Sequence, residues 1–315
     1  MNANCLNQLI FAVNAGSNTV SMLKIHNSDP TKLTMVGKPV AIPGEFPNTV
    51  AASLKNKMVC VGASGAKAGV SCASFSSTGL GEMDTLRVFE LNQSTPPVGP
   101  TNTVSQVFFS DNESMLFSTV KGDPTKNNTG FLAAFPITQA CRTSAASADQ
   151  KGVRSSPEGT AVLFGSSTIP GSSDLFVTDA SFGGAVLSID YKTSLATTKG
   201  KATVDGQKAT CWATVSSVTK TAFVTDVGSN RIVEMSLADA SIQNVIDLNA
   251  NGDPGLIDLK AAGNFIYALS PGNGSTASAV TVVDATTKLQ VQHFPVNNQT
   301  VDRNAMGMAV FLTQR

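Results

Sequence analysis

The chain has 315 residues, and its 22 Lys and Arg balance its 22 Asp and Glu, so the formal net charge is zero. A neutral chain in which only 14% of the residues are charged has no basic footprint for nucleic acid and no strong field to steer anionic substrates. No apolar run approaches the length of a transmembrane helix, and an apolar fraction of 42% excludes an intrinsically disordered chain.

In chain order, the sequence repeats a pair of short apolar strands joined by a turn of small or polar residues. The strands are about five to eight residues long, β-branched or aromatic, and separated by Gly, Asn, Asp and Pro, which indicates β-hairpins rather than helices. The clearest match is VTDASFGGAVLSI (177–189) against VTDVGSNRIVEMS (224–236). The six copies cover residues 9–25, 58–75, 115–135, 175–191, 222–237 and 265–285.

Two further strands complete each pair to a unit of four. A weaker, more polar strand follows each copy, and four strands with a period of about 45–55 residues are typical of a propeller blade. The sequence therefore predicts an all-β fold, a single β-propeller domain over 1–315 with six four-stranded blades. An apolar strand precedes every copy except the first, at 48–54, 104–110, 159–165, 211–217 and 255–261.

The two ends of the chain are predicted to share one blade. The first copy lacks a preceding strand, and the last apolar segment, Met306–Leu312, has no strand after it. We expect Met306–Leu312 to lie innermost beside Leu9–Asn14, because joining the ends removes two exposed strand edges. Three polar stretches are expected to be surface loops, at 92–103, 138–158 and 271–278.

The cysteines and the surface composition favour an extracellular protein. Cys60 and Cys72 flank the turn of one predicted hairpin, so they can form a cross-strand disulfide, with two buried thiols as the alternative. A neutral surface rich in Ser, Thr and Gly is commoner in secreted proteins, but residues 1–13 do not form a signal peptide. Either a leader was removed before this numbering or the protein stays inside the cell. Sequons for N-glycosylation occur at Asn92, Asn112, Asn127, Asn273 and Asn298.

One loop has the pattern of a calcium-binding sequence. Residues 247–258 match D-x-[DN]-x-[DN]-G with an acid at the twelfth position, and Gly252 allows the sharp turn that wraps oxygen ligands around the cation. The alternative is a plain connection between blades, because the twelfth residue is Asp258 rather than Glu and no helices flank the loop. No other cofactor is predicted. The calcium ligands would be Asp247, Asn249, Asn251 and Asp253.

The loops that lead into the innermost strands are predicted to line the ligand-binding mouth of the propeller. There a desolvated glutamate with a raised pKa can act as general acid or base, and an arginine can hold a carboxylate bidentately. The alternative is that these acids and bases pair as rim salt bridges and that the tryptophan packs between blades. The candidates are Glu45, Glu158, Arg154 and Arg303 for catalysis, and Asn48, Trp212 and Asn304 for ligand binding.

Histidine is scarce. The two histidines, His26 and His293, both lie beside predicted outer strands, which argues against a Ser-His-Asp triad and a His-rich zinc site. His293 is predicted to be a surface or inter-strand residue.

Several segments resemble a known family. VNAGSNTVSML (13–23), VGKPV (36–40), GEFP followed by VA (44–51), ATCWATV (209–215) and the VTD strands are similar to fungal secreted propellers of the 3-carboxymuconate cyclase-like type, distant relatives of 6-phosphogluconolactonase. The resemblance implies a lactonase-like propeller, usually of seven blades, that is secreted and glycosylated. It also implies metal-free lactone chemistry that uses cationic residues and a histidine. This chain differs in having six predicted blades and no histidine in the mouth loops.

Two functions follow from these observations. The first is an enzyme that forms or isomerises a lactone of a small organic acid. The second is a non-catalytic extracellular glycoprotein that binds a ligand or partner at the propeller face. A small-molecule ligand is expected, and neither nucleic acid nor a transmembrane segment is expected.

Overall fold

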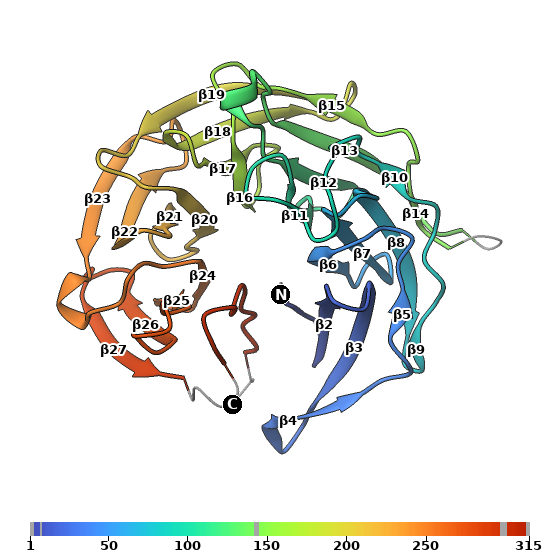
Figure 1. Ribbon diagram of the computed structural model, residues 1–315, viewed down its shortest axis with the longest axis horizontal. Helices are drawn as coiled ribbons and strands as arrows, with labels where there is room; N and C mark the ends of the chain where they lie inside the picture. The colour runs from blue at the N-terminus through green and yellow to red at the C-terminus, as the bar shows by residue number, and fades with distance from the viewer. Residues whose placement is uncertain (1–2, 7, 142–144, 297–300, 313–315) are drawn as a thin grey trace. The chain divides into compact units, whose positions relative to one another are not determined.

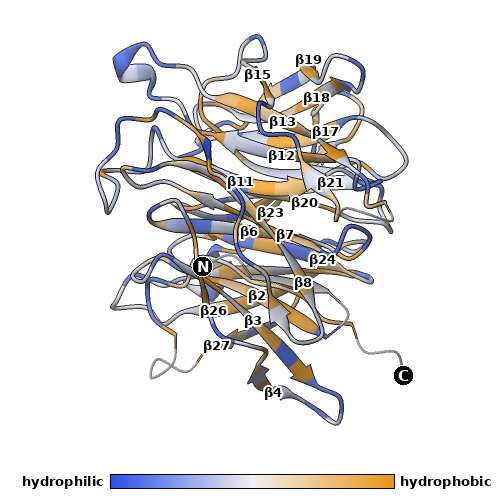
Figure 2. Cartoon of the chain, turned by 90° about the vertical axis from the view of Figure 1, so that its right-hand side faces the viewer, coloured by the Kyte–Doolittle hydropathy of each residue, from blue (hydrophilic) through white to orange (hydrophobic). Residues whose placement is uncertain are grey.

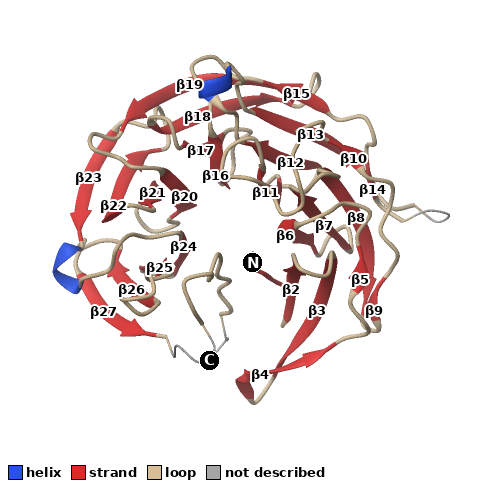
Figure 3. Ribbon diagram, viewed as in Figure 1, coloured by secondary structure: helices blue, strands red, loops and turns tan. Residues whose placement is uncertain are grey.

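The computed structural model describes residues 3–6, 8–141, 145–296 and 301–312, and these residues form antiparallel β-sheets. In this part of the chain, six sheets each contain a run of four strands, and the predicted fold class is confirmed: an all-β propeller of six four-stranded blades. Within the described ranges, two single turns of 3-10 helix lie between strands, η1 (Pro124–Lys126) and η2 (Asn249–Asn251) (Figure 3). Among the described residues no helix has the length and apolarity needed to cross a membrane.

The chain divides into two compact units. Unit 1 comprises residues 1–156, 190–195 and 313–315, and unit 2 comprises residues 157–189 and 196–312. The single domain over 1–315 stays a prediction.

Unit 1 contains three blades (Figure 1). The first consists of β1 (Ala3–Leu6), β2 (Leu9–Asn14), β3 (Thr19–His26) and β4 (Asp29–Met35), with β5 (Val40–Ala41) also on β3. The second consists of β6 (Pro47–Ser53), β7 (Met58–Ala63), β8 (Gly69–Ser76) and β10 (Arg87–Val88), with β9 (Gly79–Leu80) on β8. The third consists of β11 (Val104–Phe109), β12 (Met115–Val120), β13 (Phe131–Thr138) and β14 (Ser147–Ala148), with β15 (Val153–Ser155) on β13.

Unit 2 contains most of the fourth blade and the whole of the last two. Its first strands β16, β20 and β24 are neighbours, and β19, β23 and β27 form the far edges of their blades (Figure 1). The fourth blade consists of β16 (Leu163–Thr168), β17 (Leu175–Asp179), β18 (Gly183–Asp190) and β19 (Leu195–Thr203). The fifth consists of β20 (Thr210–Val215), β21 (Thr221–Asp226), β22 (Ser229–Ser236) and β23 (Ile242–Asp247). The sixth consists of β24 (Asp258–Ala262), β25 (Phe265–Ser270), β26 (Ala279–Asp284) and β27 (Gln290–Pro295).

Burial explains why the second strand of each blade was the easiest to recognise in the sequence. Every residue of β7, β12 and β17 is buried, because these strands have a neighbour on each side and side chains packed on both faces. The edge strands β19 and β23 are largely exposed, and their sequences are correspondingly polar. Figure 2 shows the same division, with hydrophobic colour in the strands and hydrophilic colour in many of the connecting loops.

The repeated VTD sequence has a structural reason. Its aspartate ends the second strand of the blade and is buried, at 0% exposure for Asp179 and 3% for Asp226. Asp226 accepts hydrogen bonds from the backbone N–H groups of Lys208, Ala209 and Gly228, at 2.8, 3.2 and 3.0 Å. The carboxylate therefore ties the connection that leads into β20 to the turn that follows β21. We call this arrangement the Asp226 clasp.

The threonine of the same motif fixes the first strand of the blade. Thr225 Oγ1 accepts the N–H of Trp212 at 3.1 Å, and Thr178 Oγ1 accepts the N–H of Gly165 at 2.9 Å. Both bonds lie where the register of the first strand shifts, between Thr210 and Ala213 and between Leu163 and Ser166. A bulge leaves backbone groups without ladder partners, so the buried hydroxyl satisfies a donor that would otherwise be orphaned.

The prediction that the ends of the chain pair with each other is wrong. Leu9–Asn14 pairs with β1 on one side and β3 on the other, so neither edge is open to another strand. Met306–Leu312 forms no strand, and the N–H of Met308 instead donates to Asp258 at 2.8 Å. Since β1 and β2 are joined by only two residues, their pairing costs far less chain entropy than a pairing across the length of the chain.

The predicted disulfide is confirmed. Cys60 and Cys72 are register partners in β7 and β8, and a disulfide joins them, while Cys141 is exposed and Cys211 is buried. Of the predicted loops, 138–158 contains the two short strands β14 and β15 as well as residues outside the described part.

Replacing Asp226 by Ala is expected to lower the free energy of unfolding by about 2 to 3 kcal/mol, because three backbone donors lose a charged, buried acceptor. Denaturant unfolding measures this loss. The matched control is Asp205→Ala, which removes an exposed carboxylate from the same connection and should change stability little. Equal losses in the two variants would contradict the clasp.

The double substitution Cys60→Ala and Cys72→Ala is expected to lower the free energy of unfolding by about 2 to 4 kcal/mol, because the crosslink restricts the unfolded chain. A reducing agent should destabilise the wild-type protein by a similar amount and leave the double variant unchanged. A wild-type protein insensitive to full reduction would speak against this contribution.

Candidate functional site

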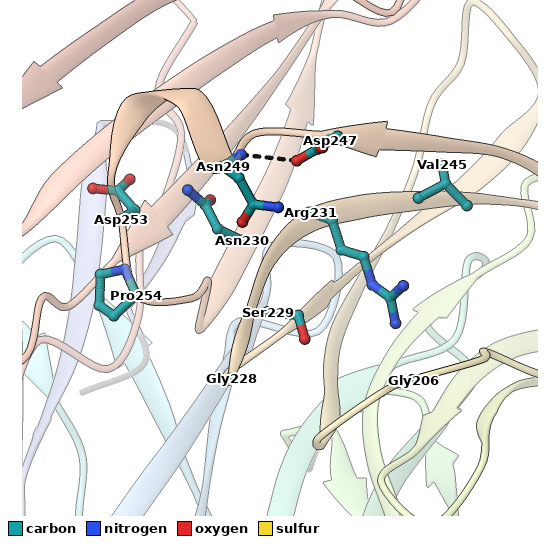
Figure 4. A pocket seen from close by; sticks show the side chains of 10 residues that line it. All are labelled: Gly206, Gly228, Ser229, Asn230, Arg231, Val245, Asp247, Asn249, Asp253 and Pro254. Carbon is teal, nitrogen blue, oxygen red and sulfur yellow. Dashed lines mark hydrogen bonds between the residues drawn. The ribbon is translucent and has the colours of Figure 1, made fainter.

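Unit 2 has a pocket of about 390 Å³ where the connections of its last two blades meet (Figure 4). The walls come from four segments: the connection before β20, the β21–β22 turn together with the start of β22, the end of β23, and the connection from β23 to β24. The lining residues are Gly206, Gly228, Ser229, Asn230, Arg231, Val245, Asp247, Asn249, Asp253 and Pro254.

The Asp226 clasp positions two of these segments. It holds the connection at Lys208 and Ala209 against the turn at Gly228. A Cβ atom on Gly228 would lie 2.8 Å from the Cβ atom of Lys208, so only glycine allows this close approach. The pocket wall is therefore built on backbone that buried hydrogen bonds keep in place.

Arg231 is the one cation among the ten residues that line the pocket. Its Nη2 donates to the carbonyl oxygen of Asp205 at 2.7 Å, and within the described ranges it makes no ion pair. That contact uses one of the five N–H donors of a guanidinium group. The positive charge of the guanidinium is not neutralised by this contact. This side of the pocket is therefore suited to a carboxylate, which arginine binds in a fixed, planar geometry.

Asp253 also lines the pocket, but its carboxylate is engaged by the protein. Its side chain is 2% exposed, and Nε2 of His293 lies 3.2 Å from each of its oxygens. The N–H of Asp253 donates to Asn251 Oδ1 at 3.1 Å, and Asn251 Nδ2 donates in turn to Thr281 and Gln290. Asp253 thus fastens the connection before β24 to the outer strands of the sixth blade.

The pairing of Asp253 with His293 was missed in the sequence. His293 is a register partner of Thr281, a fully buried polar residue with valines on both sides in β26. A buried threonine in such a strand indicates a polar contact nearby, and this was the available signal.

The predicted calcium loop lies in the same region. Asn249–Asn251 forms the short helix η2, Asp247 accepts the N–H of Asn249 at 2.9 Å, and Asn251 Oδ1 accepts from Asn230 and from the backbone of Asp253. The described residues contain no group of three or more His, Cys, Asp and Glu side chains placed to hold a metal ion. Side-chain oxygens of Asp247, Asn251 and Asp253 accept hydrogen bonds from the protein's own donors, as in a plain connection, and calcium binding stays a prediction.

In unit 1, the predicted catalytic Glu45 has a lowered rather than a raised pKa. Thr95 Oγ1 donates to Glu45 Oε2 at 2.6 Å, and Lys67 Nζ lies 3.5 Å from Oε1. The hydrogen bond from Thr95, with a smaller effect of Lys67, keeps the pKa of Glu45 below its usual value. A carboxylate held in its ionised form is a poor general acid at neutral pH.

The other two predicted residues of unit 1 have structural partners. Arg154 donates to the carbonyl oxygen of Val88 at 2.7 Å and lies over the rings of Phe89 and Phe131, 5.0 and 4.9 Å from their centroids. Asn48 Nδ2 donates to the carbonyl oxygen of Val104 at 2.7 Å, which joins the second blade to the third. Both side chains therefore link neighbouring elements of unit 1.

In unit 2, Trp212 packs as a core residue. It is 6% exposed and meets the ring of Phe164 edge-on, with centroids 6.0 Å apart. This matches the alternative interpretation, packing between blades. Glu158 and Arg303 are exposed, and Asn304 hydrogen-bonds to the side chain of Asp302. Catalytic roles for Glu45, Arg154, Glu158 and Arg303 stay predictions.

Asp258, the twelfth residue of the predicted calcium loop, is a buried acid. Burial raises its pKa from the ordinary 3.8, although Lys260, 3.5 Å away, and the N–H groups of Met308 and Leu259 act in the opposite direction. Burial therefore outweighs the favourable contacts of the ionised form.

Since the folded protein holds this proton more tightly than the unfolded chain, Asp258 contributes stability below pH 3.8 that is lost as pH rises through the raised pKa. Asp258→Asn should remove this part of the pH dependence of the unfolding free energy. Urea unfolding across this acidic range compares the two proteins. If the substitution left the slope of the unfolding free energy against pH unchanged, the raised pKa would not belong to Asp258.

Comparisons with known proteins establish the fold. No protein-family model and no curated protein matches the sequence. Among solved structures, a Bacteroides uniformis protein that carries the name 6-phosphogluconolactonase is 14% identical, with a TM-score of 0.65 over 90% of this chain and 80% of that one. A Bacteroides fragilis protein of the same name is 14% identical, with a TM-score of 0.64 over 91% and 80% of the two chains.

A chain from a nidogen–laminin complex is also similar, with 13% identity and a TM-score of 0.58 over 98% of this chain and 99% of that one. At these identities the similarity concerns the fold alone, which is a β-propeller. These neighbours do not confirm the more specific resemblance to 3-carboxymuconate cyclase-like proteins.

Proposed function

We propose that this protein is a lactonase-like propeller that binds a small organic acid in the pocket of unit 2, with Arg231 as the residue that binds the carboxylate. The observation that carries the proposal is the arginine itself, a cation on the pocket wall whose guanidinium has no carboxylate partner among the described residues. A pocket of about 390 Å³ suits a small metabolite rather than a macromolecule.

Binding without catalysis accounts best for the surrounding side chains. An acid or base needs a carboxylate or imidazole free to exchange a proton with the ligand. Asp253 has its oxygens next to His293 and is almost completely buried, so it serves to hold the wall. The remaining carboxylate of the pocket, Asp247, is exposed and accepts one backbone N–H, so its charge is available to a ligand as a binding contact.

Formation or opening of a lactone is the second candidate. It is favoured by the resemblance of the sequence to cyclase-like propellers and by the name of the two Bacteroides proteins. In that case Glu45 or Glu158 would act as acid or base, and Arg154 or Arg303 would hold the carboxylate.

We also propose that the protein resides in an oxidising, extracellular compartment. The Cys60–Cys72 disulfide supports this, because such crosslinks persist where thiols are not kept reduced. Four of the five sequons have exposed asparagines, at Asn92, Asn112, Asn127 and Asn273, which leaves them accessible to glycosylation; Asn298 lies outside the described residues.

Calorimetric titration with pentanoate, gluconate and glucono-δ-lactone tests the proposal. Arg231→Gln is expected to weaken binding of the two acids by about tenfold or more, because a charged, geometrically matched donor is lost. Arg303→Gln is the control, since it removes an exposed arginine of the same unit. Turnover of the lactone is followed in the same samples. Loss of binding in Arg303→Gln but not in Arg231→Gln would show that the acids bind at the loop around Arg303 and not in the pocket.

A further inference from the structure

The wall of the unit 2 pocket carries two opposite charges that face each other across paired strands. Arg231 in β22 and Asp247 in β23 are register partners. Side chains opposite each other in an antiparallel pair project from the same face of the sheet, with Cβ atoms about 5 Å apart. Opposite charges at this separation commonly form a salt bridge, yet in the part of the chain that the structure describes no ion pair joins them.

Each side chain is instead turned toward a different end of the pocket. The guanidinium of Arg231 extends toward the connection at Gly206 and donates to the carbonyl oxygen of Asp205 at 2.7 Å (Figure 4). The carboxylate of Asp247 turns toward Asn249 and accepts its N–H at 2.9 Å (Figure 4). The pocket therefore has a positive end and a negative end, each anchored by a hydrogen bond to backbone.

Of the two carboxylates that line the pocket, Asp247 is the one whose negative charge a ligand can reach. The other carboxylate of the lining, Asp253, is 2% exposed and lies against His293, so it offers little charge to a ligand. Asp247 is exposed, and its contact with Asn249 uses only one of the several acceptor positions of a carboxylate. A simple acid held by Arg231 would bring its own negative charge close to Asp247, and the two carboxylates would repel each other.

We infer that the pocket selects a zwitterion, an amino acid whose carboxylate meets Arg231 and whose ammonium group meets Asp247. The inference rests on the proposed function, since it adds a second recognition point to the same pocket. An ammonium group removes the repulsion from Asp247 and adds a charge-assisted hydrogen bond, whereas a hydroxyl group adds only a neutral donor.

Three ligands of the same carbon skeleton test the inference: 2-aminopentanoate, 2-hydroxypentanoate and pentanoate, titrated calorimetrically into the full chain. In the wild-type protein, 2-aminopentanoate is expected to bind about fivefold more tightly than pentanoate, as for an exposed charge pair. In Asp247→Asn, which keeps an acceptor for the N–H of Asn249, this preference should disappear. Asp239→Asn, an exposed aspartate at the other end of the same strand pair, should keep it.

The outcomes separate the two proposals. Equal binding of the three ligands that depends on Arg231 would overturn the zwitterion and leave the organic-acid pocket standing. Tightest binding of 2-hydroxypentanoate, or a preference that persists in Asp247→Asn, would also overturn the zwitterion. If none of the three ligands binds the wild-type protein, both proposals fail.

Discussion

A buried carboxylate at the end of the second strand is the interaction on which the fourth and fifth blades depend. Asp179 and Asp226 have no cationic partner among the described residues, and each instead accepts backbone N–H groups from the connection that leads into the first strand of its blade. Burying a charge is costly unless hydrogen bonds replace its water, and here the backbone supplies them. The same bonds satisfy donors of irregular segments that lack ladder partners.

The pocket follows from this constraint. Gly228 in the turn donates to Asp226, and Gly206 lies two residues before Lys208, which also donates to Asp226, so the clasp sets the distance between two walls. Arg231 lies three residues after that turn, where β22 has begun and its side chain direction is fixed by strand geometry. The opposite wall is set separately, by Asp253 and its contacts with His293 and Asn251. A charged ligand site of this kind needs rigid walls, because a mobile arginine would be paired or solvated instead.

The architecture could be predicted from the sequence where burial is strongest. The hairpins of β17–β18 and β21–β22 are mostly buried strands around a small-residue turn, a pattern that is typical of a β-hairpin. The partner of β2 could not be predicted in the same way. Ala3–Leu6 is too short to show an alternation of apolar and polar residues, whereas Met306–Leu312 has the apolar composition that is typical of a strand. The pairing of β2 with β1 is favoured by the low entropic cost of closing a short loop, and the pattern of apolar residues carries no information about that cost.

The candidate site was harder to predict for a physical reason. Glu45 and Arg154 have the residue types of an active site, but Thr95, Lys67 and two phenylalanines engage them, and such partners come from distant positions in the chain. Asp247 and Asp253 were singled out as calcium ligands for their spacing, and the structure places both in the lining of the pocket. Their present roles depend on His293 and on the cross-strand position of Arg231, which only the folded register brings near.

Amide hydrogen exchange followed by NMR tests the central constraint most directly. The clasp predicts that the N–H groups of Lys208, Ala209 and Gly228, although they lie in a connection and a turn, exchange as slowly as ladder amides of β21. Exchange of these three amides at the rate of the exposed Gly206 amide would show that the carboxylate does not hold them, and the account of the blades and of the pocket would fail together.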